Sequence, residues 1–567
     1  MTTPAPLAGA GRVAGAAALI AVLTVVSRLA GFGRTAVFTF TLAPTDLGGT
    51  YVVANAVPNV IFEIVAGGAL ASLVVPLLAG PVAAGDRATV ARTTGALLTW
   101  TLALLVPLAL VVALLAGPIV ELQGAGLSVA QQASGERMLR VFAPQLPLYG
   151  VGIVLTGVLQ AHRRFAWPVI APLLSSVTVI AVYLGFTLAE GRLAGVADVS
   201  RGGELLLSAG TTAGVVVLSL SLLIPFRRLG VTPLPGFRFP AGARARVGGL
   251  AVAGAVTVTA QQVALVVSLN QVAYGATADV GVFNLAQTVY LLPWAVLAVP
   301  LAVAAYPNLA AAHAAGDEEA YRATLAPAVR GVLLFSLLGA AALVGTAVPV
   351  GHFFFDGPAA GTAAAAIAGF APGLVGYALF ALLSRALYAR GGTRAATRAI
   401  AAGFLVVPVA VLLLAAALPL RDRVPAVTLG NSVGMLVLGV LLVVALRRAA
   451  GAAALAGAAR AAGAGLLAAV LAALAGWAAS RWLAAAGDGT PGAPAALVQG
   501  MLSGVLVGAV FLAVAWTLDR PDVRPLLAGV LRRLGRARRG TTDAPDGGTR
   551  EDGVPPERGD GKETVSR

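Results

Sequence analysis

Residues 96–120 have the sequence ALLTWTLALLVPLALVVALLAGPIV, twenty-five residues without one charged side chain. A helix rises about 1.5 Å per residue, so an apolar run of about 18 residues or more can cross the hydrocarbon core of a bilayer. Comparable apolar runs lie at residues 13–27, 246–269 and 400–420. The first of them is followed by further spans and by no small-residue cleavage site, which favours a retained helix over a signal peptide.

The composition of the whole chain agrees with this pattern. Of its 567 residues, 58% are hydrophobic and 11% are charged, whereas a soluble protein has roughly 25% charged residues. The sequence therefore predicts an all-α polytopic membrane protein with about fourteen transmembrane helices. The expected spans lie near residues 13–38, 51–79, 93–117, 138–161, 166–189, 205–226, 247–272, 280–306, 326–350, 359–388, 399–419, 425–446, 462–486 and 494–517.

The density of arginine alternates along the expected loops and predicts an orientation. If the N-terminus is cytoplasmic, the cytoplasmic segments up to the last helix contain nineteen arginines, and the external loops contain six together with ten acidic residues. An excess of Lys and Arg marks cytoplasmic loops, so we expect both termini in the cytoplasm. These loops also account for the net charge of +15, and nucleic acid is not an expected partner.

An internal repeat divides the chain. The segment VPLL…AAGD at 75–86 resembles YPNL…AAGD at 306–317, and LQAHR at 159–163 matches LYARG at 387–391. The offsets, 231 and 228 residues, are nearly equal. Both copies fall on the expected cytoplasmic side, so the repeat is parallel, an arrangement found in transporters that bind substrate between two halves.

The repeat predicts two six-helix lobes followed by an extra helix pair. The expected organisation is a cytoplasmic N-terminus (1–12), a first lobe (13–226), a cytoplasmic linker (227–246), a second lobe (247–446), a C-terminal helix pair (462–517) and a cytoplasmic, largely disordered tail (518–567). The end of the tail is rich in Gly, Pro, Asp and Arg and has too little apolar surface to fold by itself.

Polar side chains inside spans are candidates for a binding site, because ionisable residues in a membrane are costly and usually face a cavity. In the first span, Ser27, Gly31 and Arg34 share a helical face and Arg28 lies beside it. The planar guanidinium group suits bidentate binding of phosphate. The two arginines therefore suggest a phosphate-bearing substrate, although snorkelling would equally explain Arg34.

The second span and the second lobe supply the other candidates. Asn59 and Glu63 lie in the second span, and Glu63 is at a depth where it could instead form a structural ion pair with Arg28. The second-lobe candidates carry weaker signals, since amides in spans are at least as often contacts between helices as ligands. They are Gln261, Asn284, Gln287 and Arg385.

Signatures of catalysis and of cofactor binding are missing. The chain has no cysteine, its three histidines are far apart, and it contains no phosphate-binding loop of the Walker type. We therefore expect a transporter without catalytic chemistry, a metal site or a cofactor.

Several motifs give the sequence a family resemblance. They are SRLAGFGR at 27–34, VPN at 57–59, GALASLVVP at 68–76, LTGVLQA at 155–161 with RFAWP at 164–168, YPNL at 306–309 and LSRALYA at 383–389. From about residue 13 to residue 450 the chain resembles the MurJ/MviN family of lipid II flippases, in the MOP exporter superfamily, as a divergent member of the actinobacterial type.

The resemblance implies a location, a substrate and a site. It implies a bacterial plasma-membrane protein with fourteen helices in two lobes, which flips lipid II, the undecaprenyl-diphosphate-linked precursor of peptidoglycan, to the outer leaflet by alternating access. Expected partners are lipid II, membrane lipids and proteins of cell-wall synthesis or division. The resemblance also implies that Arg28 and Arg34 are cavity residues and that the last two helices form a groove for the lipid tail. We predict that Arg28→Ala abolishes activity without loss of folding or abundance.

The sequence departs from the family pattern at three places, and these leave alternatives open. Gly49 stands where well-known members have an acidic residue, Phe62 stands where they have a basic one, and Gln287-Thr288 replaces an Asp-Arg pair. The second-lobe side of the cavity is thus expected to be less basic. The alternatives are an exporter of another polyprenyl-linked glycan or of a small molecule, and a non-transporting scaffold for cell-wall or division proteins.

Overall fold

The computed structural model describes residues 10–64, 71–124, 126–238, 243–276, 278–485 and 491–524. For residues 10–21, 71–73, 76, 243–253, 484 and 485, only the backbone is described. Within the described ranges the regular structure is helical throughout, which confirms the predicted all-α class. The predicted disorder of the tail concerns residues that lie mostly outside these ranges.

Ten helices form the first half of the chain. They are α1 (Ala10–Thr41), α2 (Asp46–Phe62), α3 (Ala71–Ala83), α4 (Arg87–Leu114), α5 (Ala116–Gln123), α6 (Val129–Phe142), α7 (Gln145–Ala161), α8 (Ala166–Glu190), α9 (Arg201–Ser221) and α10 (Leu223–Arg227).

The second half contains ten more helices and three short helical turns. They are α11 (Ala243–Gly275), α12 (Asp279–Pro293), η2 (Trp294–Ala298), α13 (Val299–Ala314), α14 (Glu318–Phe354), α15 (Gly357–Phe370), α16 (Gly373–Ala389), α17 (Thr393–Ala417), η3 (Leu420–Asp422), α18 (Arg423–Ala450), η4 (Ala452–Leu455), α19 (Ala458–Ala485) and α20 (Ala493–Leu518).

The predicted spans coincide with these helices. Within the described residues, eleven helical segments are long and apolar enough to cross a membrane, and a twelfth consists of α15 and α16, bent by 44°. These twelve correspond to the predicted spans from the third to the fourteenth. The first predicted span, 13–38, lies within the helical backbone of α1, where the side chains of residues 13–21 are not described. The second, 51–79, includes residues 65–70, which lie outside the described set, and its described part is helical. The count of fourteen therefore stays a prediction.

The sequence repeat corresponds to repeated local structure. Gly85 and Gly316 adopt left-handed backbone angles of φ 69° and 70°, and the aspartate after each accepts a hydrogen bond from a backbone N–H in the first turn of α4 or α14. In the second pair of segments, Arg163 and Gly391 both have positive φ. The same turn thus recurs at matching places in both halves, as expected for a parallel repeat.

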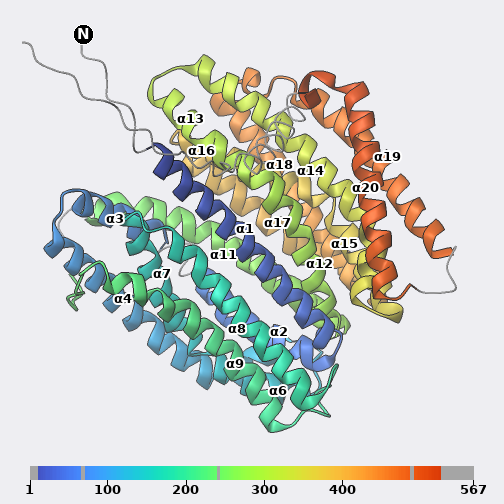
Figure 1. Ribbon diagram of the computed structural model, residues 1–567, viewed down its shortest axis with the longest axis horizontal. Coiled ribbons are helices and arrows are strands. Elements are labelled where there is room, and N and C mark those ends of the chain that lie inside the picture. The colour runs from blue at the N-terminus through green and yellow to red at the C-terminus, as the bar shows by residue number, and fades with distance from the viewer. Residues whose placement is uncertain are drawn as a thin grey trace, which may run out of the picture.

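The helices form two groups (Figure 1). In the first group α1 packs on α8, α8 on α9, and α4 on α7; in the second, α18 packs on α16 and α17, and α11 on α17. The helices α19 and α20 form a pair against α14 on the flank of the second group. The large apolar side chains of α4, α17 and α20 remain largely exposed on the surface of the bundle, as expected where helices face lipid rather than water.

An ion-pair cluster holds the end of α20 to the second group. Asp522 accepts hydrogen bonds from Arg330 of α14 at 2.7 Å and from Arg460 of α19 at 2.8 Å. Asp519 is fully buried and lies 3.0 Å from the Arg460 guanidinium. Burial and the neighbouring charge of Asp522 raise the pKa of Asp519. The C-terminal pair is therefore attached to the second half at its α14 face.

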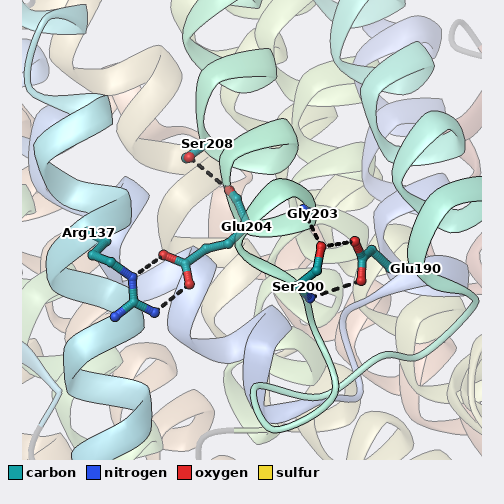
Figure 2. A network of polar contacts seen from close by, with 6 residues as sticks. All are labelled: Arg137, Glu190, Ser200, Gly203, Glu204 and Ser208. Atoms are coloured by element: carbon teal, nitrogen blue, oxygen red, sulfur yellow. Dashed lines mark hydrogen bonds and ion pairs between the residues drawn. The ribbon is translucent and has the colours of Figure 1, made fainter.

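A second polar cluster joins three helices of the first half (Figure 2). Arg137 of α6 donates two hydrogen bonds to the carboxylate of Glu204 in α9, at 2.7 and 2.5 Å. Beside it, Ser200 caps α9 and is itself held by Glu190 at the end of α8. The side chain of Glu204 is only 8% exposed. The cluster fixes the ends of α6, α8 and α9 relative to one another.

We expect Glu204→Gln to lower the stability of the purified protein. Hydrogen bonds to charged groups contribute roughly 1.5–3 kcal/mol, and the change removes the charge from a buried partner of Arg137. The measurement is the midpoint of thermal unfolding in detergent. The matched control is Glu136→Gln, because Glu136 pairs with Arg140 on an exposed face, where such pairs contribute about 0.3–0.5 kcal/mol. Equal midpoints for both variants would refute the structural role of the Arg137–Glu204 pair.

Candidate functional site

The main cavity lies between the two halves of the chain and has a volume of about 320 Å³. Its wall is built mostly from the first half, with α11 and α12 closing the side of the second half. The lining residues are Arg34, Thr35, Phe38, Tyr51, Val52, Asn55, Ala56, Asn59, Tyr149, Ser175, Val179, Tyr183, Thr211, Val215, Leu218, Leu265, Leu269, Asn284 and Gln287. We refer to it as the central cavity.

Arg34 is the charged residue of this lining. Among the described residues its guanidinium group has no acidic partner and no hydrogen bond to the protein. The side chain is exposed to the cavity. A guanidinium group without a counter-ion, at a concave and partly apolar surface, is a ready partner for an anion of the phosphate type.

A network of hydroxyl groups forms one wall of the central cavity. The hydroxyl of Tyr51 lies 2.9 Å from that of Tyr183 and 2.8 Å from that of Thr211. Nearby, the Tyr149 hydroxyl donates to the amide oxygen of Asn59 at 3.0 Å. These residues come from α2, α7, α8 and α9, so the packing of the first half positions them. They give Arg34 a polar but uncharged surround.

A smaller cavity of about 180 Å³ lies within the second half. Its lining residues are Gln261, Gln262, Ala264, Leu265, Ser268, Phe283, Gln287, Tyr290, Leu291, Phe370, Tyr377, Phe404, Asn431 and Met435. Leu265 and Gln287 line both cavities, so the two are neighbours. We refer to it as the second cavity.

The structure brings some predicted site residues together. Arg34, Asn59, Asn284 and Gln287 line the central cavity, and Gln261 lines the second. From the helix-1 motif, Arg34 lines the central cavity, together with Asn284 and Gln287 of α12. Whether these residues bind a ligand stays a prediction.

Other predicted site residues lie outside both linings. They are Ser27, Arg28, Gly31, Glu63 and Arg385. Ser27, Arg28 and Gly31 precede Arg34 by one to two turns of α1. Arg28 and Glu63 are both exposed, and no ion pair joins these two described residues.

Glu63 and Arg385 both lie in helical backbone. The α-helix α2 ends at Phe62, and Glu63 follows it with helical angles of φ −61° and ψ −40°. Arg385 donates a hydrogen bond to the carbonyl oxygen of Ala381 at 2.6 Å, one turn earlier in the same helix. Its guanidinium group is thus directed back along α16.

Several cavity residues were not predicted from the sequence. They are Asn55, Tyr51, Tyr149, Tyr183 and Thr211. A signal was available for part of the set, since Tyr51, Asn55 and Asn59 follow one another at intervals of four residues and so share one face of α2. Tyr149, Tyr183 and Thr211 come from three other helices, and no sequence spacing connects them.

The two halves are in contact at one end of the bundle. Phe40, near the end of α1, packs against Phe353 and Phe354 at the end of α14, with ring centroids 5.4 and 5.0 Å apart. In α12, a Cβ atom on Gly281 would lie 2.0 Å from the carbonyl oxygen of Ala43. The backbones of the two halves thus lie too close here for a side chain at position 281, at the end that the arginine distribution predicts to be external.

The described residues contain no group of three His, Cys, Asp or Glu side chains that could hold a metal ion. Both cavity linings lack acidic residues. The arrangement can therefore bind an anion through Arg34 and uncharged polar groups through amides and hydroxyls.

Comparison with known proteins gives a consistent result. The family model described as "Lipid II flippase MurJ" matches residues 41–488. The lipid II flippase MurJ of Burkholderia cenocepacia is 27% identical over 405 residues, which are 68% of this chain and 74% of that protein. A probable lipid II flippase MurJ of Synechocystis is 28% identical over 223 residues, 38% of this chain and 40% of that one.

Solved structures resemble the fold. A lipid II flippase MurJ in an inward closed conformation has a TM-score of 0.68 at 17% identity, covering 88% of this chain and 99% of that one. An inward-facing multidrug resistance transporter of the MATE family, in the MOP superfamily, has a TM-score of 0.62 at 15% identity, covering 76% and 98%. At these identities the likeness concerns the fold alone.

Proposed function

Because the chain belongs to the MurJ family of lipid II flippases, we propose that it moves lipid II across the membrane by alternating access between its two halves. The observation that carries the proposal is the central cavity, which lies between the halves and presents the guanidinium group of Arg34, a group with no acidic partner within the described ranges. The diphosphate of the substrate would bind there while the polyprenyl tail stays in the bilayer.

The proposal includes an orientation and a division of the chain. We place both termini in the cytoplasm because the arginine-rich loops then lie inside. The first lobe comprises residues 13–226, the second lobe residues 247–446, and the linker residues 227–246 lie between them. In this orientation the contact between Phe40 and Phe354 closes the external side, and the cavity would be loaded from the cytoplasmic side.

Charge argues against the export of cationic drugs, which the likeness to a MATE transporter would otherwise suggest. An acidic group is the strongest partner for a cationic substrate, because a buried cation without a partner is costly. The linings of both cavities contain no Asp or Glu, and the central cavity contains Arg34. An anionic headgroup fits this charge, and a cation does not.

Complementation tests the proposed function. A bacterium depleted of its own lipid II flippase should grow when it expresses this chain, and rescue should fail with Arg34→Ala and with Arg28→Ala at equal abundance in the membrane. The same proteins in liposomes should flip fluorescent lipid II. Absence of flipping by the wild-type chain in liposomes would refute the proposal. Normal flipping by the Arg28 variant would remove Arg28 from the predicted site and leave the function standing.

A further inference from the structure

The lining of the second cavity includes one buried amide oxygen without a hydrogen-bond partner among the described residues. Gln262 is only 8% exposed, and among the described residues its amide oxygen has no hydrogen-bond partner. By contrast, most hydroxyl groups in the described spans donate a hydrogen bond to a carbonyl oxygen of their own helix, as Ser384 does at 2.6 Å. A buried polar atom without a partner costs roughly 1–3 kcal/mol, so its presence in a cavity indicates a group that binds there.

Neighbouring side chains add to the same chemistry. Gln261, Gln287 and Asn431 also line the second cavity. Their amides can donate as well as accept. No charged residue lies in this lining. The cavity therefore offers paired donors and acceptors without charge, which suits hydroxyl and acetamido groups and not phosphate or carboxylate.

Aromatic rings form another part of the second cavity's lining. Tyr290 stacks on Phe370 with centroids 4.8 Å apart and an interplanar angle of 16°, and it is 6.0 Å from Tyr377. Phe380, which lies outside the lining, stacks on Tyr377 with ring centroids 5.7 Å apart. The rings come from α12, α15 and α16 and are held by one another. Pockets that combine apolar aromatic walls with a few placed polar groups are typical of small-molecule recognition.

The two cavities can hold parts of one ligand. Gln287 and Leu265 stand between them and line both. A volume of about 180 Å³ is below the roughly 300–1,000 Å³ of pockets that enclose a whole ligand. The second cavity is therefore a place for one group of a larger molecule whose anionic part is held at Arg34.

We propose that the second cavity is the subsite for an uncharged, N-acetylated sugar of the headgroup, with its acetamido group bonded by Gln262 and its ring against Tyr290 and Tyr377. This assignment rests on the proposed function and extends it, because it says which part of the lipid-linked substrate each half of the protein recognises. In this assignment the first half binds the diphosphate through Arg34, and the second half binds the sugar.

Binding of two lipids to the full-length protein in nanodiscs tests the assignment. One lipid is undecaprenyl diphosphate, which has no sugar, and the other is lipid II. In Gln262→Leu the dissociation constant for lipid II should rise about tenfold, since one or two hydrogen bonds are lost, and that for undecaprenyl diphosphate should stay within about twofold. Gln261→Leu, at a half-buried position of the same lining, should show the same selective loss and serves if the first variant does not fold.

The control variant is Gln132→Leu. Gln132 lies in α6 outside both cavities and bonds to the carbonyl oxygen of Leu127, so it should bind both lipids normally. An equal loss for both lipids in the Gln262 variant, or no loss for either, would overturn the sugar subsite. Wild-type protein that binds the two lipids equally well would overturn it too, while leaving diphosphate recognition intact. Wild-type protein that binds neither lipid would refute the proposed function itself.

Discussion

Arg34→Ala is expected to reduce binding of the diphosphate-linked lipid by roughly 10- to 150-fold and to reduce flipping accordingly. Arg34 contributes the charged group of the central cavity lining, and it has no acidic partner among the described residues. Hydrogen bonds to charged groups contribute roughly 1.5–3 kcal/mol, and each 1.4 kcal/mol corresponds to a factor of ten in affinity. The measurement is the dissociation constant for undecaprenyl diphosphate, followed by the rate of flipping in liposomes.

A graded series separates the geometry of the guanidinium group from its charge. Arg34→Lys keeps the positive charge but loses the planar fork that binds two phosphate oxygens, so its affinity should fall between those of the wild type and Arg34→Ala. The matched control is Arg140→Ala, because Arg140 is exposed at the end of α6 and lies outside both cavities. Wild-type affinity in Arg34→Ala would show that the anion binds elsewhere.

The helices could be predicted from the sequence because their causes are local. Long apolar runs such as residues 96–120 can satisfy their backbone hydrogen bonds in a membrane only within a helix. Aspartates at the starts of α4 and α14 cap the first turns, and glycines with positive φ precede them. These signals lie within a few residues of one another, so the repeat at 75–86 and 306–317 was visible as a sequence match.

The residues that line the cavity could be predicted only in part. A residue lines the cavity only if it lies at the right position along its helix as well as on the right helical face. Ser27 and Arg34 were assigned to one face of the first helix, yet Arg34 lines the cavity and Ser27 does not. Seven residues separate them, a distance of roughly 10 Å along the helix. Where the second half closes over α1 is decided by α11 and α12, which come more than 200 residues later.

The role of Tyr51 illustrates what a single sequence cannot supply. Its hydroxyl meets those of Tyr183 and Thr211, 132 and 160 residues away. Each of the three is an ordinary residue in an apolar span, and only the packing of α2, α8 and α9 makes them a polar wall. By contrast, Gln287 was detected because an amide within an apolar run is unusual in itself.

Cross-linking the two halves at their closed end is expected to abolish transport. Alternating access requires the contact between Phe40 and Phe354 to open, because the cavity must reach the outer side. The chain has no cysteine, so F40C/F354C introduces the only two thiols, and a short thiol-specific linker can join side chains whose rings are 5.0 Å apart. Flipping should stop on cross-linking and return when a reducible linker is cleaved.

The matched control joins α4 of the first half to the linker segment that packs on it. Trp100 of α4 packs against Phe237 with ring centroids 5.2 Å apart, so W100C/F237C places the same linker at a contact that does not cross between the halves. We expect this variant to flip lipid II at the same rate before and after cross-linking. If the linked F40C/F354C protein also kept its rate, the halves would not separate at this end during transport. The substrate would then have to leave by another route.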